Sequence, residues 1–129
     1  MRIFIAFIAI LAAYLAYQQY DGKKRQNAFN ELVISIDKQP VNQFELKHSL
    51  NTQVKAKCQS LGNQDADIEK MNDCLNTISA YQDECELQIF RLAPVEFESS
   101  RDAVDYGKRY QRCVFNSQFS NLIDVPKLL

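Results

Sequence analysis

The chain has 129 residues, of which 15 are basic, 16 are acidic and four are cysteines. Beyond the first 25 residues, eleven basic residues stand against fifteen acidic ones. A mildly acidic domain without a basic stripe is a poor candidate for nucleic acid binding. The remaining hundred or so residues allow one domain with a modest core. Gly and Pro are scarce, at three each, which favours an all-α fold over a β-sandwich.

The chain begins with an uncharged apolar segment at residues 3–17. Its length suits the apolar region of a signal peptide, and it is short for a spanning helix, which needs about 20 residues. Polar residues stay few as far as Gly22, so a longer membrane segment over residues 1–22 is also consistent with the sequence. Aromatic and basic residues then follow as at a membrane–water interface: Tyr14, Tyr17, Tyr20, Lys23, Lys24 and Arg25.

A signal-peptidase site is poorly marked in this segment. The peptidase prefers small residues at positions −3 and −1, but Ala16 has Tyr14 two positions before it, and Ala13 has Leu11. We therefore expect an uncleaved signal anchor. The alternative is an ordinary signal peptide whose removal leaves a free secreted domain.

The charges around the segment oppose an exported domain. Three basic residues follow the segment, and the positive-inside rule places such a flank in the cytoplasm. A cytosolic domain would keep its cysteines reduced. The cysteine spacing favours an oxidised domain, so we expect a single-pass inner-membrane protein whose main domain is periplasmic. A cytosolic domain with free thiols is the third alternative.

Apolar spacing predicts a connecting amphipathic helix within residues 23–40. Its apolar positions follow the i, i+3, i+4, i+7 pattern: Phe29, Leu32, Val33 and Ile36. Pro40 interrupts the pattern. We expect these four side chains to be available for packing against a partner protein.

Residues 41–129 are predicted to form a small antiparallel bundle that, with the connecting helix, has three to four helices. One helix reaches from Phe44 to Leu61, with Gly62 as its C-terminal cap. A longer one follows from residue 68 to 92, capped by Asp65 or Asp67. The last begins at Ser99, continues to residue 123 and stops before Pro126, and the apolar tail 122–129 is a further surface for a partner.

The cysteines predict two disulfides, each joining neighbouring helices. Cys74 and Cys85 lie on one predicted helix about 16 Å apart, too far to bond, since bonded Cα atoms lie within about 7 Å. In an antiparallel hairpin, residues at similar distances from the turn face each other. Cys58 and Cys74 flank the turn near residue 64, and Cys85 and Cys113 flank the loop near residue 96. We therefore predict Cys58–Cys74 and Cys85–Cys113, since the pairing of Cys58 with Cys85 falls far out of register.

The sequence holds no pattern that points to a reaction. His48 is the only histidine, and no cysteine pair has the two-to-four-residue spacing of zinc ligands or the C-x-x-C of redox proteins. Isolated glycines do not form a phosphate-binding loop. We therefore expect no enzyme, no metal, no cofactor, no small-molecule substrate and no nucleic acid partner.

Two functions are consistent with these features. The first is a membrane-anchored scaffold or accessory subunit of an envelope assembly, bound to an unidentified protein partner. The second is a free secreted or periplasmic binding protein, such as an inhibitor or an immunity protein. The fate of the N-terminal segment discriminates between them.

Overall fold

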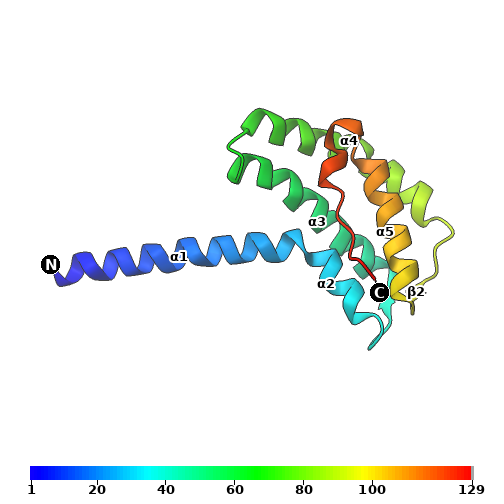
Figure 1. Ribbon diagram of the computed structural model, residues 1–129, viewed down its shortest axis with the longest axis horizontal. Coiled ribbons are helices and arrows are strands. Elements are labelled where there is room, and N and C mark those ends of the chain that lie inside the picture. The colour runs from blue at the N-terminus through cyan, green and yellow to red at the C-terminus, as the bar shows by residue number, and fades with distance from the viewer. Residues whose placement is uncertain (129) are drawn as a thin grey trace.

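The computed structural model describes residues 1–128, and Leu129 lies outside the described residues. It is mostly helical, with six helices and one pair of two-residue strands. A long helix, α1 (Arg2–Gln26), extends away from all the other elements, which pack together (Figure 1). We call residues 28–128 the head.

Helix α1 is one continuous helix through Gly22 and breaks only at Asn27. Asn27 has φ −113° and ψ 11°, and its side-chain amide donates to the Lys23 carbonyl at 3.2 Å. The following helix, α2 (Ala28–Ser35), turns into the head. The predicted connecting helix is therefore short, and the residues assigned to its start belong to α1.

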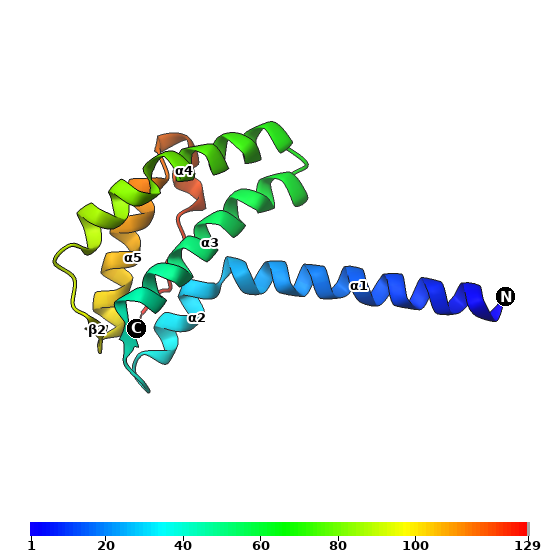
Figure 2. The ribbon, with the colours of Figure 1, turned by 180° about the vertical axis from the view of Figure 1, so that it is seen from behind.

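Helices α3 (Gln43–Asn63) and α4 (Ile68–Phe90) form an antiparallel hairpin, visible from behind in Figure 2. Asn42 caps α3 by accepting from the Glu45 amide at 2.8 Å. Of the two predicted caps for α4, Asp67 is the one used, and it accepts from the Lys70 amide at 3.0 Å. The prediction of Gly62 as a C-terminal cap is wrong, because α3 continues past it.

The left-handed position in this turn is taken by Ala66, with φ 53°. Gly62 has another role, since a Cβ there would lie 2.5 Å from the Met71 Sδ. Its missing side chain lets α4 approach α3 closely.

Two short strands, β1 (Val41–Asn42) and β2 (Glu96–Phe97), pair antiparallel at the base of the head. Val41 faces Phe97 in this pair, and both side chains are buried. Gln43 extends the connection, because its amide donates to the Val95 carbonyl at 2.8 Å and its side chain donates to the Phe90 carbonyl at 3.2 Å. The loop after α4 is thereby fixed to the start of α3.

Helix α5 (Ser100–Val114) begins at the predicted cap Ser99, whose Oγ accepts from the Asp102 amide at 3.4 Å. The predicted continuation of this helix to residue 123 is wrong. The backbone is extended at Phe115, with ψ 115°, and a separate 3-10 helix, η1 (Ser117–Leu122), follows. The turn between them lets both Phe115 and Phe119 reach the core.

Both predicted disulfides are present. Cys58 bonds to Cys74 with a Cα–Cα distance of 5.5 Å, and Cys85 bonds to Cys113 at 5.8 Å. The first joins α3 to α4 and the second joins α4 to α5, so α4 is fixed covalently on both sides.

The core lies between α2, α3, α4, α5 and the strand pair. Its largest fully buried side chains include members from several of these elements: Phe29, Leu46, Leu50, Ile78, Phe97, Tyr110 and Phe119. Fully burying a large apolar side chain is worth about 1.5–3 kcal/mol. Helix α1 contributes no buried residue to this core.

A buried amide pair holds the C-terminal tail against the head. Gln111 donates to the Asp124 carbonyl and accepts from the Asp124 amide, both at 2.9 Å. Gln53 donates to the same carbonyl at 3.0 Å, and Lys57 pairs with the Asp124 carboxylate at 3.0 Å. The tail is therefore bound by backbone and side chain together, and Val125 packs against the core.

Candidate functional site

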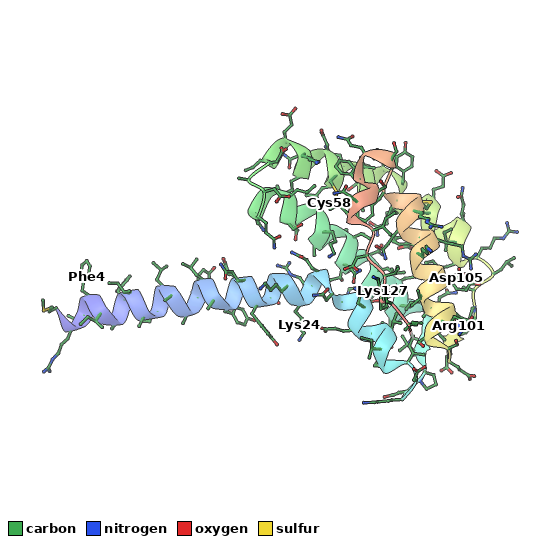
Figure 3. All side chains as sticks on the ribbon, viewed as in Figure 1. Phe4, Lys24, Cys58, Arg101, Asp105 and Lys127 are labelled. Carbon is green, nitrogen blue, oxygen red and sulfur yellow. A yellow bond between two sulfur atoms is a disulfide. The ribbon has the colours of Figure 1, made fainter. Side chains whose placement is uncertain are left out.

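Helix α1 exposes apolar side chains along its whole length (Figure 3). Its apolar stretch is long and hydrophobic enough for a membrane anchor or a signal sequence, and none of it is buried. Phe4 and Phe7 are each 75% exposed, which is far from the usual environment of phenylalanine in a folded domain.

The predicted interface residues occupy the second half of α1. Tyr14, Tyr17 and Tyr20 are exposed, and the Tyr14 hydroxyl accepts from the Gln18 side chain at 2.8 Å. The three basic residues form the last turn of the helix: Lys23, Lys24 and Arg25. Positive charge at the carboxyl end of a helix is stabilising. Arg25 also pairs with Asp21 at 3.2 Å.

The four side chains expected to pack on a partner instead pack within the head. Phe29, Val33 and Ile36 are buried in its core, and Leu32 is half-buried against it. The amphipathic pattern predicted the apolar face correctly, but it gives no information on which surface covers that face. The predicted tail surface is partly occupied, since Leu122 and Ile123 pack against the core, whereas Leu128 is exposed and Leu129 lies outside the described residues.

Gln53 explains why α2 docks here. Its buried Oε1 accepts from the amides of Phe29 at 3.0 Å and Asn30 at 3.3 Å. These are the first N–H groups of α2, which have no partner within their own helix. Because α1 ends at Gln26 and α2 begins at Ala28, these amides belong to the start of a new helix, and a side chain of α3 caps it. Sequence periodicity does not reveal this cap, since Gln53 lies 24 residues away from Phe29.

Exposed apolar side chains gather around Gln43, at the base of the head. Phe44 follows it in the chain, Leu87 shares a surface hollow with it, and Val95 accepts its amide hydrogen. Leu92 completes the group on the loop after α4, and it is 90% exposed. We call Phe44, Leu87, Leu92 and Val95 the basal apolar cluster.

His48 lies exposed on α3, with its ring stacked near Phe44 at a centroid distance of 6.5 Å. Within residues 1–128, no group of three or more His, Cys, Asp or Glu side chains is arranged to hold a metal ion. The four cysteines are consumed in disulfides.

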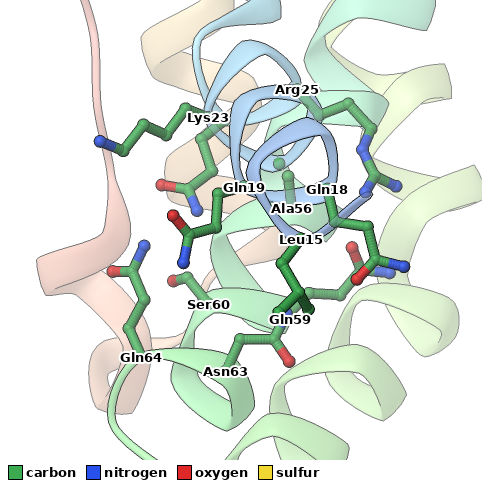
Figure 4. A pocket seen from close by; sticks show the side chains of 12 residues that line it. Leu15, Gln18, Gln19, Lys23, Arg25, Ala56, Gln59, Ser60, Asn63 and Gln64 are labelled. Atoms are coloured by element: carbon green, nitrogen blue, oxygen red, sulfur yellow. The ribbon is translucent and has the colours of Figure 1, made fainter. Parts of the chain in front are cut away.

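A groove of 530 Å³ separates the second half of α1 from the end of α3. Figure 4 shows it from close by. Helix α1 lines it with one face, including Leu15, Gln19 and Lys23, and α3 lines it with Ser60 and Gln64 among others. It is the place where the anchor-like helix and the head come together.

Tyr110 belongs to a polar group inside the head. Its hydroxyl donates to the Asn51 side-chain oxygen, and the Asn51 amide donates to Glu86 at 2.6 Å. Burial raises the pKa of the Tyr110 phenol well above its usual range, and the negative charges of Glu86 and Asp83 raise it further. The phenol is therefore a hydrogen-bond donor throughout the physiological range and links α5 to α3 and α4.

Comparison of the chain with protein-family models, curated proteins and solved structures finds no significant match.

Proposed function

We propose that the protein is a non-enzymatic, membrane-anchored scaffold or accessory subunit of an envelope assembly. In this proposal α1 crosses the inner membrane once and the head lies in the periplasm. The observation that carries it is the contrast between a fully exposed apolar helix and a head fastened by two disulfides. The first needs lipid, and the second needs an oxidising compartment.

The arrangement of the head supports a rigid structural role. Helices α2 to α5 form the proposed antiparallel bundle, with α4 bonded to both neighbours. The Gln53 cap joins the end of the anchor to the core of this bundle. In the proposal, a movement of the membrane helix therefore moves the head as one rigid body.

The basal apolar cluster supports a protein partner. It consists of four large apolar side chains between 69% and 90% exposed, which come from the start of α3, the end of α4 and the loop after α4. Exposed apolar patches commonly mark interaction sites, and in the proposal these four side chains form one. In the proposal this cluster takes the partner-packing role that the sequence assigned to α2.

A second candidate is a free binding protein released by cleavage of α1. It is favoured by the absence of any buried residue in α1, because the head keeps its whole core when that helix is lost. The same basal apolar cluster would then bind a target outside the membrane.

The intact mass of the natively expressed protein separates these candidates. The protein is recovered from membrane and soluble fractions, denatured without reductant and alkylated before mass spectrometry. A full-length mass without alkyl groups in the membrane fraction supports the anchored proposal. A shortened mass in the soluble fraction supports the free binder, and four alkyl groups on a full-length chain contradict both by placing the head in the cytosol.

Partner contact at the basal apolar cluster is tested by photocrosslinking in the native host. A photoreactive residue replaces Leu92, and a matched control replaces Asn76, which is also exposed but lies on the first half of α4. The proposal expects a discrete adduct from position 92 alone. Equal adducts from both positions, or none from position 92, contradict a partner site at the cluster.

A further inference from the structure

The groove between α1 and α3 is built from two matching polar faces. On α1 the lining residues follow helical spacing, and so do those at the end of α3. The residues on α1 are Leu15, Gln18, Gln19, Gly22, Lys23, Arg25 and Gln26, and those on and just after α3 are Ala56, Gln59, Ser60, Asn63 and Gln64. The inference below rests on the proposed function, in which α1 stays in the membrane.

Several polar side chains of this groove have no partner in the part of the chain that the structure describes, although Gln18 donates to Tyr14 and Ser60 donates to the Lys57 carbonyl. Over residues 1–128, the side-chain amides of Gln19, Gln59 and Gln64 make no hydrogen bond, and Lys23 makes no salt bridge. Among the described residues no Asp or Glu lines the groove. In Figure 4, Gln19 and Gln64 point toward each other beside Ser60, with Lys23 on the same side. Lys23 is therefore the one lining cation within residues 1–128 that has no ion pair, because the other, Arg25, pairs with Asp21.

The depth of the groove along α1 places it at the membrane surface. From Ile3 to Leu15 the helix rises about 18 Å, less than the roughly 30 Å of a hydrocarbon core, so a crossing by α1 requires the bilayer to thin around this short apolar segment. Polar side chains of α3 cannot enter hydrocarbon without hydrogen-bond partners. The membrane boundary therefore falls where Leu15 gives way to Gln18 and Gln19, and lipid headgroups lie beside the groove.

We propose that this groove binds the phosphate group of a phospholipid. A phosphodiester carries one negative charge and several acceptor oxygens, which suits one lysine and a set of neutral donors. Lys23 pairs with the phosphate, and the side-chain amides of Gln19 and Gln64 donate hydrogen bonds to it. The acyl chains follow the apolar part of α1 before Leu15. The bound headgroup fills the groove between α1 and α3.

The test uses two neighbouring lysines of equal charge. Full-length protein with both disulfides is reconstituted in nanodiscs of equimolar phosphatidylcholine and phosphatidylglycerol, transferred to mild detergent and measured by native mass spectrometry. Lys23→Gln is compared with Lys24→Gln, because Lys24 does not line the groove. We expect wild type and Lys24→Gln to retain one lipid, and Lys23→Gln to lower the lipid-bound fraction about fivefold, the effect of one basic contact. Equal loss in the two variants overturns the site.

A second variant fills the groove without changing charge. Ser60→Trp should lower lipid retention as Lys23→Gln does, whereas Ser79→Trp, on an exposed position of α4, should not. Retention unaffected by Ser60→Trp overturns the proposal. So does tight Lys23-dependent binding of inorganic phosphate in lipid-free detergent, because the ligand is then a free anion.

Failure of this inference is distinguishable from failure of the anchor. A full-length protein that floats with vesicles but retains no lipid overturns the headgroup site alone. A protein recovered without α1 overturns the anchored function and the headgroup site together.

Discussion

The ring of Phe29 on α2 lies against the backbone of Gly107 on α5. A Cβ at position 107 would lie 2.1 Å from the Phe29 Cζ, so no side chain fits between them. The segment that follows α1 thus enters the head at the one point of α5 that has no side chain. This contact and the Gln53 cap together fix the direction in which α1 leaves the head.

Replacing Gly107 with alanine should destabilise the head by about 2 kcal/mol, in the range of overpacked cores. Phe29 is fully buried and has no free space to accommodate the added methyl group. The matched control is Gly62→Ala, where the nearest atom belongs to the flexible Met71 thioether, which can turn aside. Thermal unfolding of the two variants checks this, and equal losses would show that the Phe29 contact is not rigid.

Replacing Gln111 with methionine should release the C-terminal tail. Gln111 both donates to and accepts from the backbone of Asp124, and methionine can do neither. We expect a loss of about 1–3 kcal/mol, as for buried groups left without partners, with faster hydrogen exchange at the Asp124 amide. Gln118→Met, at an exposed glutamine, serves as the control. Unchanged exchange at Asp124 would mean that Gln53 and Lys57 suffice to hold the tail.

Removing either disulfide should cost about 3 kcal/mol in the chain-entropy model. The bonds close segments of 16 and 28 residues, so the Cys85–Cys113 bond is expected to contribute slightly more. Double replacements to alanine, Cys58 with Cys74 and Cys85 with Cys113, avoid leaving a free thiol. Denaturant unfolding without reductant measures both, and the prediction is wrong if their curves coincide with that of the parent.

The stability of the head should fall above about pH 10, where tyrosine in an unfolded chain loses its proton. Burial raises the pKa of Tyr110 in the folded head, so the folded state keeps a proton that the unfolded state releases. Stability therefore declines as pH rises through this range. Tyr110→Phe should lose about 1 kcal/mol at neutral pH, from the hydrogen bond to Asn51, and show a shallower alkaline decline.

The matched control for this prediction is Tyr81→Phe, because Tyr81 is exposed. Its unfolding free energy should follow the parent at every pH. If the unfolding free energies of the parent and of Tyr110→Phe fall equally with rising pH, the buried Tyr110 phenol is not the cause of the alkaline decline.

The disulfide pairing was predictable because it follows from helix geometry alone. A rise of 1.5 Å per residue excludes the bond between Cys74 and Cys85, and hairpin register then selects among the remaining pairs. The caps Asp67 and Ser99 were predictable for a similar reason, since a cap is a local bond between near neighbours.

The interactions that place α2 and the tail could not be read from the sequence. An apolar stripe such as that of Phe29 and Val33 has the same spacing whether a partner or the head covers it. Gln53 and Gln111 read as ordinary helix-surface residues, yet both are buried because distant backbone groups satisfy them. Likewise, the spacing of Phe115 and Phe119 fits a continued helix. In the structure the helix ends before Phe115, and both side chains enter the core because the chain turns there.

The order of the cysteines along the chain has a consequence for biogenesis. Each disulfide joins two cysteines that are consecutive in the sequence: Cys58 bonds to Cys74, and Cys85 bonds to Cys113. When a chain is exported from its N-terminus, Cys58 and Cys74 emerge first. They can bond to each other before Cys85 and Cys113 emerge. Oxidation in order of emergence therefore yields the native bonds directly, with no need for thiol–disulfide exchange to correct them.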